Sequence, residues 1–237
     1  MGNLMSMTII GMILQALATS TPRTAAELRQ DRNSIDMAAL EARVAELETD
    51  RRRLLLAGGN DALRANDDAL ADARIDVERA SALIEELDRL AAERPAPARV
   101  LDVGAGSGIL AIAAVKLWPA ATVVAVDNDP IAVAACAENA GVNAVGDRIA
   151  SAATPVGDVD GQFDLVLANI QAHVLRELLP GIAPRVAPGG TLVMSGLLSP
   201  QAEAVAEDYA AVGFTVEAIR PSAADPAWSS AVLRRPS

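Results

Sequence analysis

Val100-Leu-Asp-Val-Gly-Ala-Gly-Ser-Gly-Ile-Leu110 is the stretch of this 237-residue sequence that decides the fold. Gly104, Gly106 and Gly108 follow an apolar run that is typical of a buried strand. Glycine lets the backbone turn tightly and approach a ligand where a Cβ atom would clash. The dinucleotide-binding fingerprint Gly-x-Gly-x-x-Gly would need its third glycine at position 109, which is isoleucine. The stretch therefore predicts a strand, a ligand-binding turn and a helix, in a register that differs from a dinucleotide site.

Three polar residues at predicted strand ends point to the kind of ligand. Asp102 precedes the first glycine, where its carboxylate would repel a pyrophosphate but could accept hydrogen bonds from an ammonium group. Asp127 ends the next predicted strand, where an acid can take both hydroxyls of a ribose. Asn169 ends a later strand, on the rim where open α/β sheets bind ligands. Alone, each could be a helix cap or a tight turn, but together and in this order they favour a ligand site.

The pattern of residues 99–237 predicts an α/β fold with a Rossmann-like sheet. Short runs rich in valine and leucine alternate with helical segments, which predicts right-handed βαβ units and helices on both faces of a parallel sheet. Two later runs have no helix between them and are expected to pair antiparallel at the sheet edge. The predicted strands are 99–103, 122–126, 148–152, 163–168, 191–195, 214–220 and 229–235, and the predicted helices are 108–117, 129–140, 171–180 and 199–212.

Residues 1–93 have a different, wholly helical pattern, and the proline-containing residues 94–98 form a linker to the second domain, 99–237. Apolar residues recur at heptad spacing on both sides of Gly58-Gly-Asn-Asp61, which predicts an antiparallel coiled-coil hairpin over about residues 36–92. The hairpin could pack on the second domain or on another subunit, which would make a homodimer. The apolar run 8–17 is shorter than the roughly 20 residues that span a bilayer, so we expect an amphipathic helix there.

The charge and composition of the chain limit the kinds of partner that it can bind. The formal net charge is −11, which disfavours nucleic acid and anionic membranes and suits a basic protein or a small cofactor. The sequence has one cysteine, Cys136, and one histidine, His173, so it can form neither an internal disulfide nor a Cys/His metal cluster. A reducing, cytoplasmic setting follows. We expect Cys136 in the core and His173 either as a general base or as a polar surface residue.

Residues 99–235 resemble the PrmA family of class I S-adenosylmethionine-dependent methyltransferases, which methylates amino groups of the large-subunit ribosomal protein numbered eleven. Leu-Ala-Asn-Ile at 167–170, followed by Ser195-Gly-Leu-Leu198, is particular to that family. The other stretches that carry the resemblance are Leu101–Ala114, Ala125–Pro130, Glu138–Ala140, Ala187–Leu192 and Trp228–Arg235.

The resemblance implies a seven-stranded class I methyltransferase sheet and an enzyme that methylates protein amino groups, of the lysine type. It implies S-adenosyl-L-methionine as the cofactor, a basic ribosomal protein as the partner, and no metal. Asn169 would be the catalytic residue, orienting the acceptor amine through its side-chain oxygen. The implied cofactor-binding residues are Asp102, Gly104, Ala105, Gly106, Asp127 and Asn169.

The sequence also departs from the family pattern. The family has a mixed α/β substrate-binding domain and a Phe-Gly-Thr-Gly-x-His linker where this chain has the helical pattern and residues 94–98. Residues 151–157 lack the acid that many methyltransferases place near the adenine, where Thr154 could substitute. Two alternatives therefore stay open. One is a methyltransferase for a small molecule or another protein, and the other is an inactive coiled-coil interaction protein with a methyltransferase-like scaffold.

Overall fold

The computed structural model describes residues 85–223 and 225–237, together with Leu83 and five isolated positions earlier in the chain. The run 8–17 lies outside the described residues. So does the predicted hairpin, apart from those isolated positions and the helical residues 85–92 at its end. The same holds for dimerisation through that hairpin, which stays a prediction. Among the described residues, no helix is long and apolar enough to cross a membrane.

The described residues form a seven-stranded mixed sheet in the order β3-β2-β1-β4-β5-β7-β6. Strands β1 to β5 pair in parallel, while β7 runs antiparallel to both of its neighbours. The strands are β1 (Arg99–Val103), β2 (Thr122–Val126), β3 (Ile149–Ala152), β4 (Phe163–Asn169), β5 (Val186–Leu198), β6 (Thr215–Pro221) and β7 (Trp228–Arg234). The α-helices are α4 (Ile109–Leu117), α5 (Pro130–Val142), α6 (Ala172–Ile182) and α7 (Ser199–Ala210).

The predicted alternation of strands and helices is confirmed, including the antiparallel pair at the sheet edge. The largest difference is β5, which begins at Val186 rather than at the predicted residue 191. Pro188, Gly189 and Gly190 interrupt its apolar pattern, and the pairing with β4 is irregular between Phe163 and Leu165. A bulge lets a strand carry such residues, but it leaves no alternating sequence pattern to detect.

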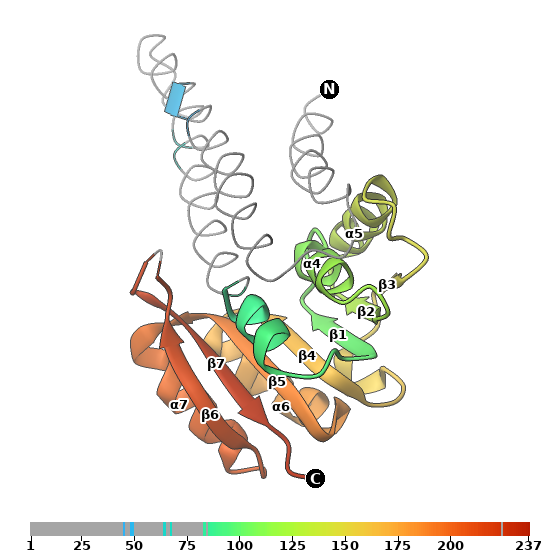
Figure 1. Ribbon diagram of the computed structural model, residues 1–237. Coiled ribbons are helices and arrows are strands. Elements are labelled where there is room, and N and C mark those ends of the chain that lie inside the picture. Colours follow the sequence, from blue (N-terminus) through green and yellow to red (C-terminus); the bar gives the residue numbers. More distant parts are fainter. Residues whose placement is uncertain are drawn as a thin grey trace.

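Helices cover both faces of the sheet (Figure 1). On the α4 face, helices α4 and α5 and the helical residues 85–93 pack on side chains that include Leu165, Leu167 and Val193. On the α6 face, helices α6 and α7 pack on the alternate side chains, such as Val166 and Met194. Because successive side chains of a strand point to opposite faces, this division assigns a face to each residue of the site.

A buried ion pair fastens the helical residues 85–93 to the sheet. Leu83, Leu87 and Leu90 enter the core of the α4 face, and the side chain of Glu86 is only 2% exposed. Its carboxylate accepts from Arg220 of β6 at 2.7 Å and from Arg89 at 3.3 Å. A buried charge is tolerated when it is paired in this way. The helix that precedes residues 94–98 is therefore part of the same packed body as the sheet.

Candidate functional site

The predicted site residues meet at the carboxyl ends of β1, β2 and β4. The strand order reverses between β1 and β4, which is where open α/β sheets bind ligands. The glycine turn, residues 104–108, leads from β1 into α4, and all three of its glycines have positive φ. The backbone N–H groups of Gly104 and Ala105 both donate to the Val126 carbonyl, at 2.8 and 3.0 Å. These bonds hold the turn against the end of β2.

Asp127 lies next to the glycine turn, as predicted. Its Oδ2 accepts from the Gly106 N–H at 2.9 Å, and its Oδ1 accepts from the Asp129 N–H at 3.0 Å. The side chain is half-buried, and each carboxylate oxygen can accept a further hydrogen bond. The carboxylate therefore organises the turn and retains acceptor capacity for the two hydroxyls of a ribose.

Asp102 lies beneath the turn and is fully buried. Its Oδ2 accepts from the Ala111 N–H of α4 at 3.0 Å, while its Oδ1 has no hydrogen-bond partner. Burial raises the pKa of the carboxyl to about 7. The bond from Ala111 lowers this pKa, and the negative charge of Asp127 raises it further. Near neutral pH the Asp102 carboxyl is therefore partly protonated, and a cation beside it would lower its pKa and favour the carboxylate.

This pKa predicts a pH dependence of stability. In the unfolded chain this aspartate has its ordinary pKa of about 3.9. Between about pH 4 and 7 the folded protein therefore holds a proton on Asp102 that the unfolded chain has lost. The stability that this group gives below pH 4 is therefore lost progressively between about pH 4 and 7, by about 1.4 kcal/mol per pH unit, and no more is lost above that range. We expect Asp102→Asn to remove this loss in urea unfolding measured at pH 5 and pH 8. The exposed change Asp160→Asn should leave the loss in place, and equal pH profiles for wild type and Asp102→Asn would contradict the assignment.

Helix α5 supports the turn from the side. Cys136 is buried there, as predicted, and a Cβ atom added at Gly108 would lie 2.6 Å from its Sγ. The Asn139 side-chain amide donates to the Ser107 carbonyl at 2.8 Å. Sequence reasoning gave Asn139 no role; the available signal was a polar residue on a helix that is otherwise rich in alanine. Asn139 is only 3% exposed, and its hydrogen bond to Ser107 makes it a structural support of the glycine turn.

Asn169 ends β4 and packs against β5 at Gly196. Gly196 has a φ of +73°, and a Cβ atom added there would lie 2.9 Å from Asn169 Oδ1 and 3.2 Å from the Ile170 carbonyl. Glycine is therefore needed at position 196 for the Asn169 amide to lie this close. Asn169 Oδ1 is itself buried and has no hydrogen-bond partner.

Three buried side-chain atoms of the described residues lack a hydrogen-bond partner: Asp102 Oδ1, Asn169 Oδ1 and Ser195 Oγ. They belong to three adjacent strands, β1, β4 and β5. Asp102 pairs with Leu167 and Asn169 pairs with Ser195, so all three side chains lie on the α4 face. A buried polar atom left unpaired costs about 1–3 kcal/mol. A row of three oxygens near the sheet's binding edge fits a ligand that is rich in N–H donors. The sequence analysis used Ser195 only as part of the family-specific stretch 195–198 and gave it no role in the site.

The remaining candidates are not joined to this row. His173 is exposed on the first turn of α6, as the surface interpretation expects. Thr154 is half-buried beyond the end of β3. Within the part of the chain that the structure describes, no group of three or more His, Cys, Asp or Glu side chains could hold a metal ion.

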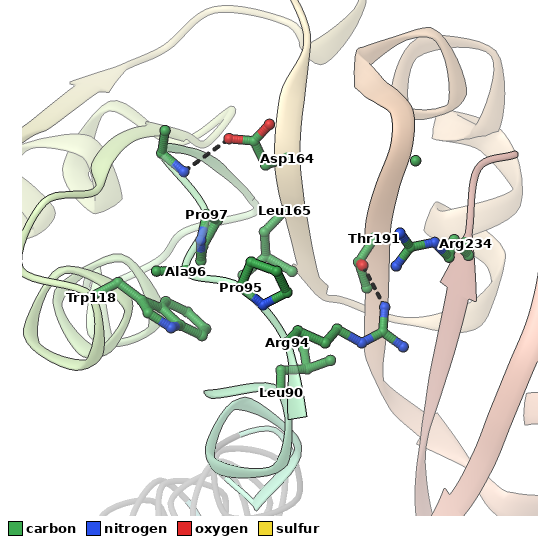
Figure 2. Close-up of a pocket in the computed structure, with 12 residues that line it drawn as sticks. Leu90, Arg94, Pro95, Ala96, Pro97, Trp118, Asp164, Leu165, Thr191 and Arg234 are labelled. Atoms are coloured by element: carbon green, nitrogen blue, oxygen red, sulfur yellow. Dashed lines mark hydrogen bonds between the residues drawn. The ribbon is translucent and has the colours of Figure 1, made fainter. Parts of the chain in front are cut away.

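A hollow of about 300 Å³ lies at the opposite end of the sheet from the glycine turn, where β1 and β4 begin (Figure 2). Arg94 crosses it, donating to Thr191 Oγ1 at 2.7 Å and pairing with Glu217. Asp164 accepts from the N–H groups of Ala98 and Arg99 at 2.9 and 3.0 Å. These bonds fasten residues 94–98 to the sheet, far from the glycine turn. In this chain the linker therefore makes no contact with the predicted cofactor site.

The fold and the site define a class. A seven-stranded sheet with its last strand antiparallel between β5 and β6, a glycine turn after β1 and an acid after β2 is typical of class I methyltransferase domains. The family model for ribosomal protein L11 methyltransferase (PrmA) matches residues 80–236. The chain belongs to this family, as the sequence resemblance predicted.

Curated relatives carry the same description as the family model. The ribosomal protein L11 methyltransferase of Methylococcus capsulatus is 55% identical over 120 residues, which are 51% of this chain and 40% of the relative. The protein of the same description from Bordetella parapertussis is 54% identical over 121 residues, 51% of this chain and 38% of the relative. The chain thus spans about two fifths of the length of these relatives.

Two solved structures superimpose on this chain. A ribosomal protein L11 methylase from Lactobacillus delbrueckii subsp. bulgaricus superimposes with a TM-score of 0.58 at 32% identity, covering 66% of this chain and 79% of that chain. The [4+2]-cyclase SpnF superimposes with a TM-score of 0.54 at 16% identity, covering 68% and 82%. Since a cyclase shares the fold, the fold alone does not specify methyl transfer, and the argument for function must come from the site.

Proposed function

We propose that the chain is an S-adenosylmethionine-dependent N-methyltransferase that acts on amino groups of ribosomal protein L11, of the lysine type. The single observation that carries this proposal is the row of unpartnered oxygens on Asp102, Asn169 and Ser195 beside the glycine turn. Acceptor oxygens suit two N–H-rich groups, the cofactor's ammonium and the substrate's amine. The names of the curated relatives supply the acceptor protein.

The residues fit the cofactor. Asp127 would hold the ribose hydroxyls, Asp102 would face the ammonium group, and Gly104, Ala105 and Gly106 would line the methionine end. When bound, S-adenosylmethionine supplies a methyl group on a positively charged sulfonium. The protein's own contribution is to align the acceptor amine with that methyl group, and good alignment of two reactants can remove several kcal/mol of barrier.

Asn169 would orient the amine through Oδ1, and the amine would lose its proton to water. Gly196 and Ile170, the described residues that lie beside Asn169 Oδ1, have no titratable side chain, and His173 is exposed on α6. The net charge of −11 suits a basic protein acceptor. A cytoplasmic location agrees with a buried, unpaired thiol at Cys136.

The cofactor half of the proposal is tested by calorimetric titration with S-adenosylhomocysteine, the reaction product. We expect micromolar binding to the wild-type chain and at least tenfold weaker binding, about 1.4 kcal/mol, to Asp127→Ala. The reason is that Asp127 both holds the Gly106 N–H and offers its oxygens to the ribose. Asp129→Ala is the matched control, since Asp129 caps α5 through the Ile131 N–H and is exposed.

The two outcomes separate the candidate functions. Equal affinities for Asp127→Ala and wild type would overturn the ribose assignment. No binding to the wild-type chain at millimolar ligand would favour the inactive interaction protein.

The acceptor half is tested by mass spectrometry of purified bacterial ribosomal protein L11 after incubation with S-adenosylmethionine and the chain. We expect the mass of L11 to increase by that of one or more methyl groups, each replacing a hydrogen. An unmodified L11 with intact cofactor binding would favour another acceptor.

A further inference from the structure

Ser195 is a buried hydroxyl that nothing in the fold explains. It is 1% exposed, it lies in β5, and its Oγ has no hydrogen-bond partner. A buried polar group without a partner is a liability unless it serves a ligand. Removing it should therefore leave the fold intact, because the native structure gains no hydrogen bond from it.

The register places Ser195 beside Asn169. The two residues are paired on the neighbouring parallel strands β4 and β5, so their side chains leave the same face of the sheet, with strands about 4.8 Å apart. The β5–β7 pairing is irregular between Met194 and Leu197, directly at this point. Gly196, with its positive φ, then brings β5 close to the Asn169 amide oxygen. The distorted part of β5 therefore lies against the Asn169 amide, and Ser195 is the residue of β5 paired with Asn169 at that point.

The chemistry of this pair selects its ligand. An amide oxygen only accepts hydrogen bonds, and a serine hydroxyl can accept as well. A primary amine or its ammonium form can donate to both oxygens at once. An alcohol has a single donor, and a fully substituted ammonium group has none.

We propose that Ser195 Oγ and Asn169 Oδ1 together form the binding site for a primary amine, and that Ser195 is an amine-binding residue of this chain. The inference rests on the proposed function and deepens it, because it adds Ser195 to Asn169 as a second residue that positions the acceptor amine. The pair favours amines over hydroxyl acceptors through the number of N–H donors rather than through charge.

The test is a titration of the full chain with n-butylammonium, followed by NMR of the side-chain amides, with and without S-adenosylhomocysteine. Two probes with the same butyl chain are compared: n-butanol, which has one donor, and butyltrimethylammonium, which has the charge, no N–H and a bulkier head group. We expect n-butylammonium to bind at least fivefold more tightly than either probe. In Ser195→Ala this preference should fall by at least threefold, with thermal stability kept or raised.

Ser229→Ala is the matched control, because Ser229 is also a buried serine but lies on the α6 face of β7, bonded to Ser199 at 2.8 Å. It should lose stability and keep the preference for n-butylammonium. An unchanged preference in Ser195→Ala, or equal binding of all three probes to the wild type, would overturn the inference. Should Ser195→Ala fail to fold, that result would itself assign a structural role to the hydroxyl and overturn the inference. Failure of the proposed function has a different result, which is that S-adenosylhomocysteine does not bind. The two failures can be distinguished because the amine titration is also carried out on the chain without S-adenosylhomocysteine.

Discussion

Gly108→Ala is expected to lower the free energy of unfolding by about 2–5 kcal/mol, a large loss of stability for a single change in the glycine turn. Gly108 has a φ of +80°, which costs an alanine about 1–2 kcal/mol. The new methyl group would also lie 2.6 Å from Cys136 Sγ and 3.2 Å from Cys136 Cα. Overpacking of this kind adds about 1–3 kcal/mol, because the backbone of α5 must move. Urea unfolding measures the change.

Gly213→Ala is the control for the backbone term. Gly213 has a φ of +103°, but an added Cβ atom would have no heavy atom within 4 Å. Its change should therefore cost only about 1–2 kcal/mol. Adding Cys136→Ala to Gly108→Ala should recover part of the loss, because the closest contact is to the sulfur. If Gly108→Ala and Gly213→Ala prove equal, the packing of α5 against the turn is not tight.

Asn169→Ala is expected to lower the rate of methyl transfer by about 10²–10³, the usual effect of removing one oriented hydrogen-bonding group from a site. The affinity for S-adenosylhomocysteine should change by less than threefold, because Asp127 and the glycine turn remain. Steady-state kinetics with ribosomal protein L11 and calorimetry with S-adenosylhomocysteine measure the two quantities.

Gln171→Ala provides the comparison for Asn169→Ala. It removes the same amide group from an exposed residue at the start of α6 that makes no capping bond. Its transfer rate should stay within twofold of wild type. An Asn169→Ala protein that retains a third of the wild-type rate would show that Asn169 does not orient the amine.

The sequence predicted most of the fold because the strands of a parallel sheet are short, apolar and separated by helices. It also predicted the neighbourhood of Asp102, Asp127 and the glycine turn, because those residues lie at strand ends. Strand ends of one sheet meet at one edge, so local sequence is enough to bring them together.

Two features of the structure could not be predicted from the sequence. Ser195 is a candidate site residue only because it is paired with Asn169, and the register between β4 and β5 cannot be predicted from either strand alone. The ion pair between Glu86 and Arg220 joins residues 134 positions apart, and both side chains look like ordinary surface charges in the sequence. The beginning of β5 was missed because proline and glycine erased the alternating pattern there.

The position of β7 has a consequence for the order in which the protein can be made. β7 follows every other described strand in the chain, yet it lies between β5 and β6. While the ribosome is still translating residues 228–234, β6 has no strand to pair with and one edge of β5 is open. Such an unpaired edge is prone to aggregate in a nascent chain. The described sheet can therefore be completed only after β7 has been synthesised, and a chaperone that shields the β5 edge until then would raise the yield of folded protein.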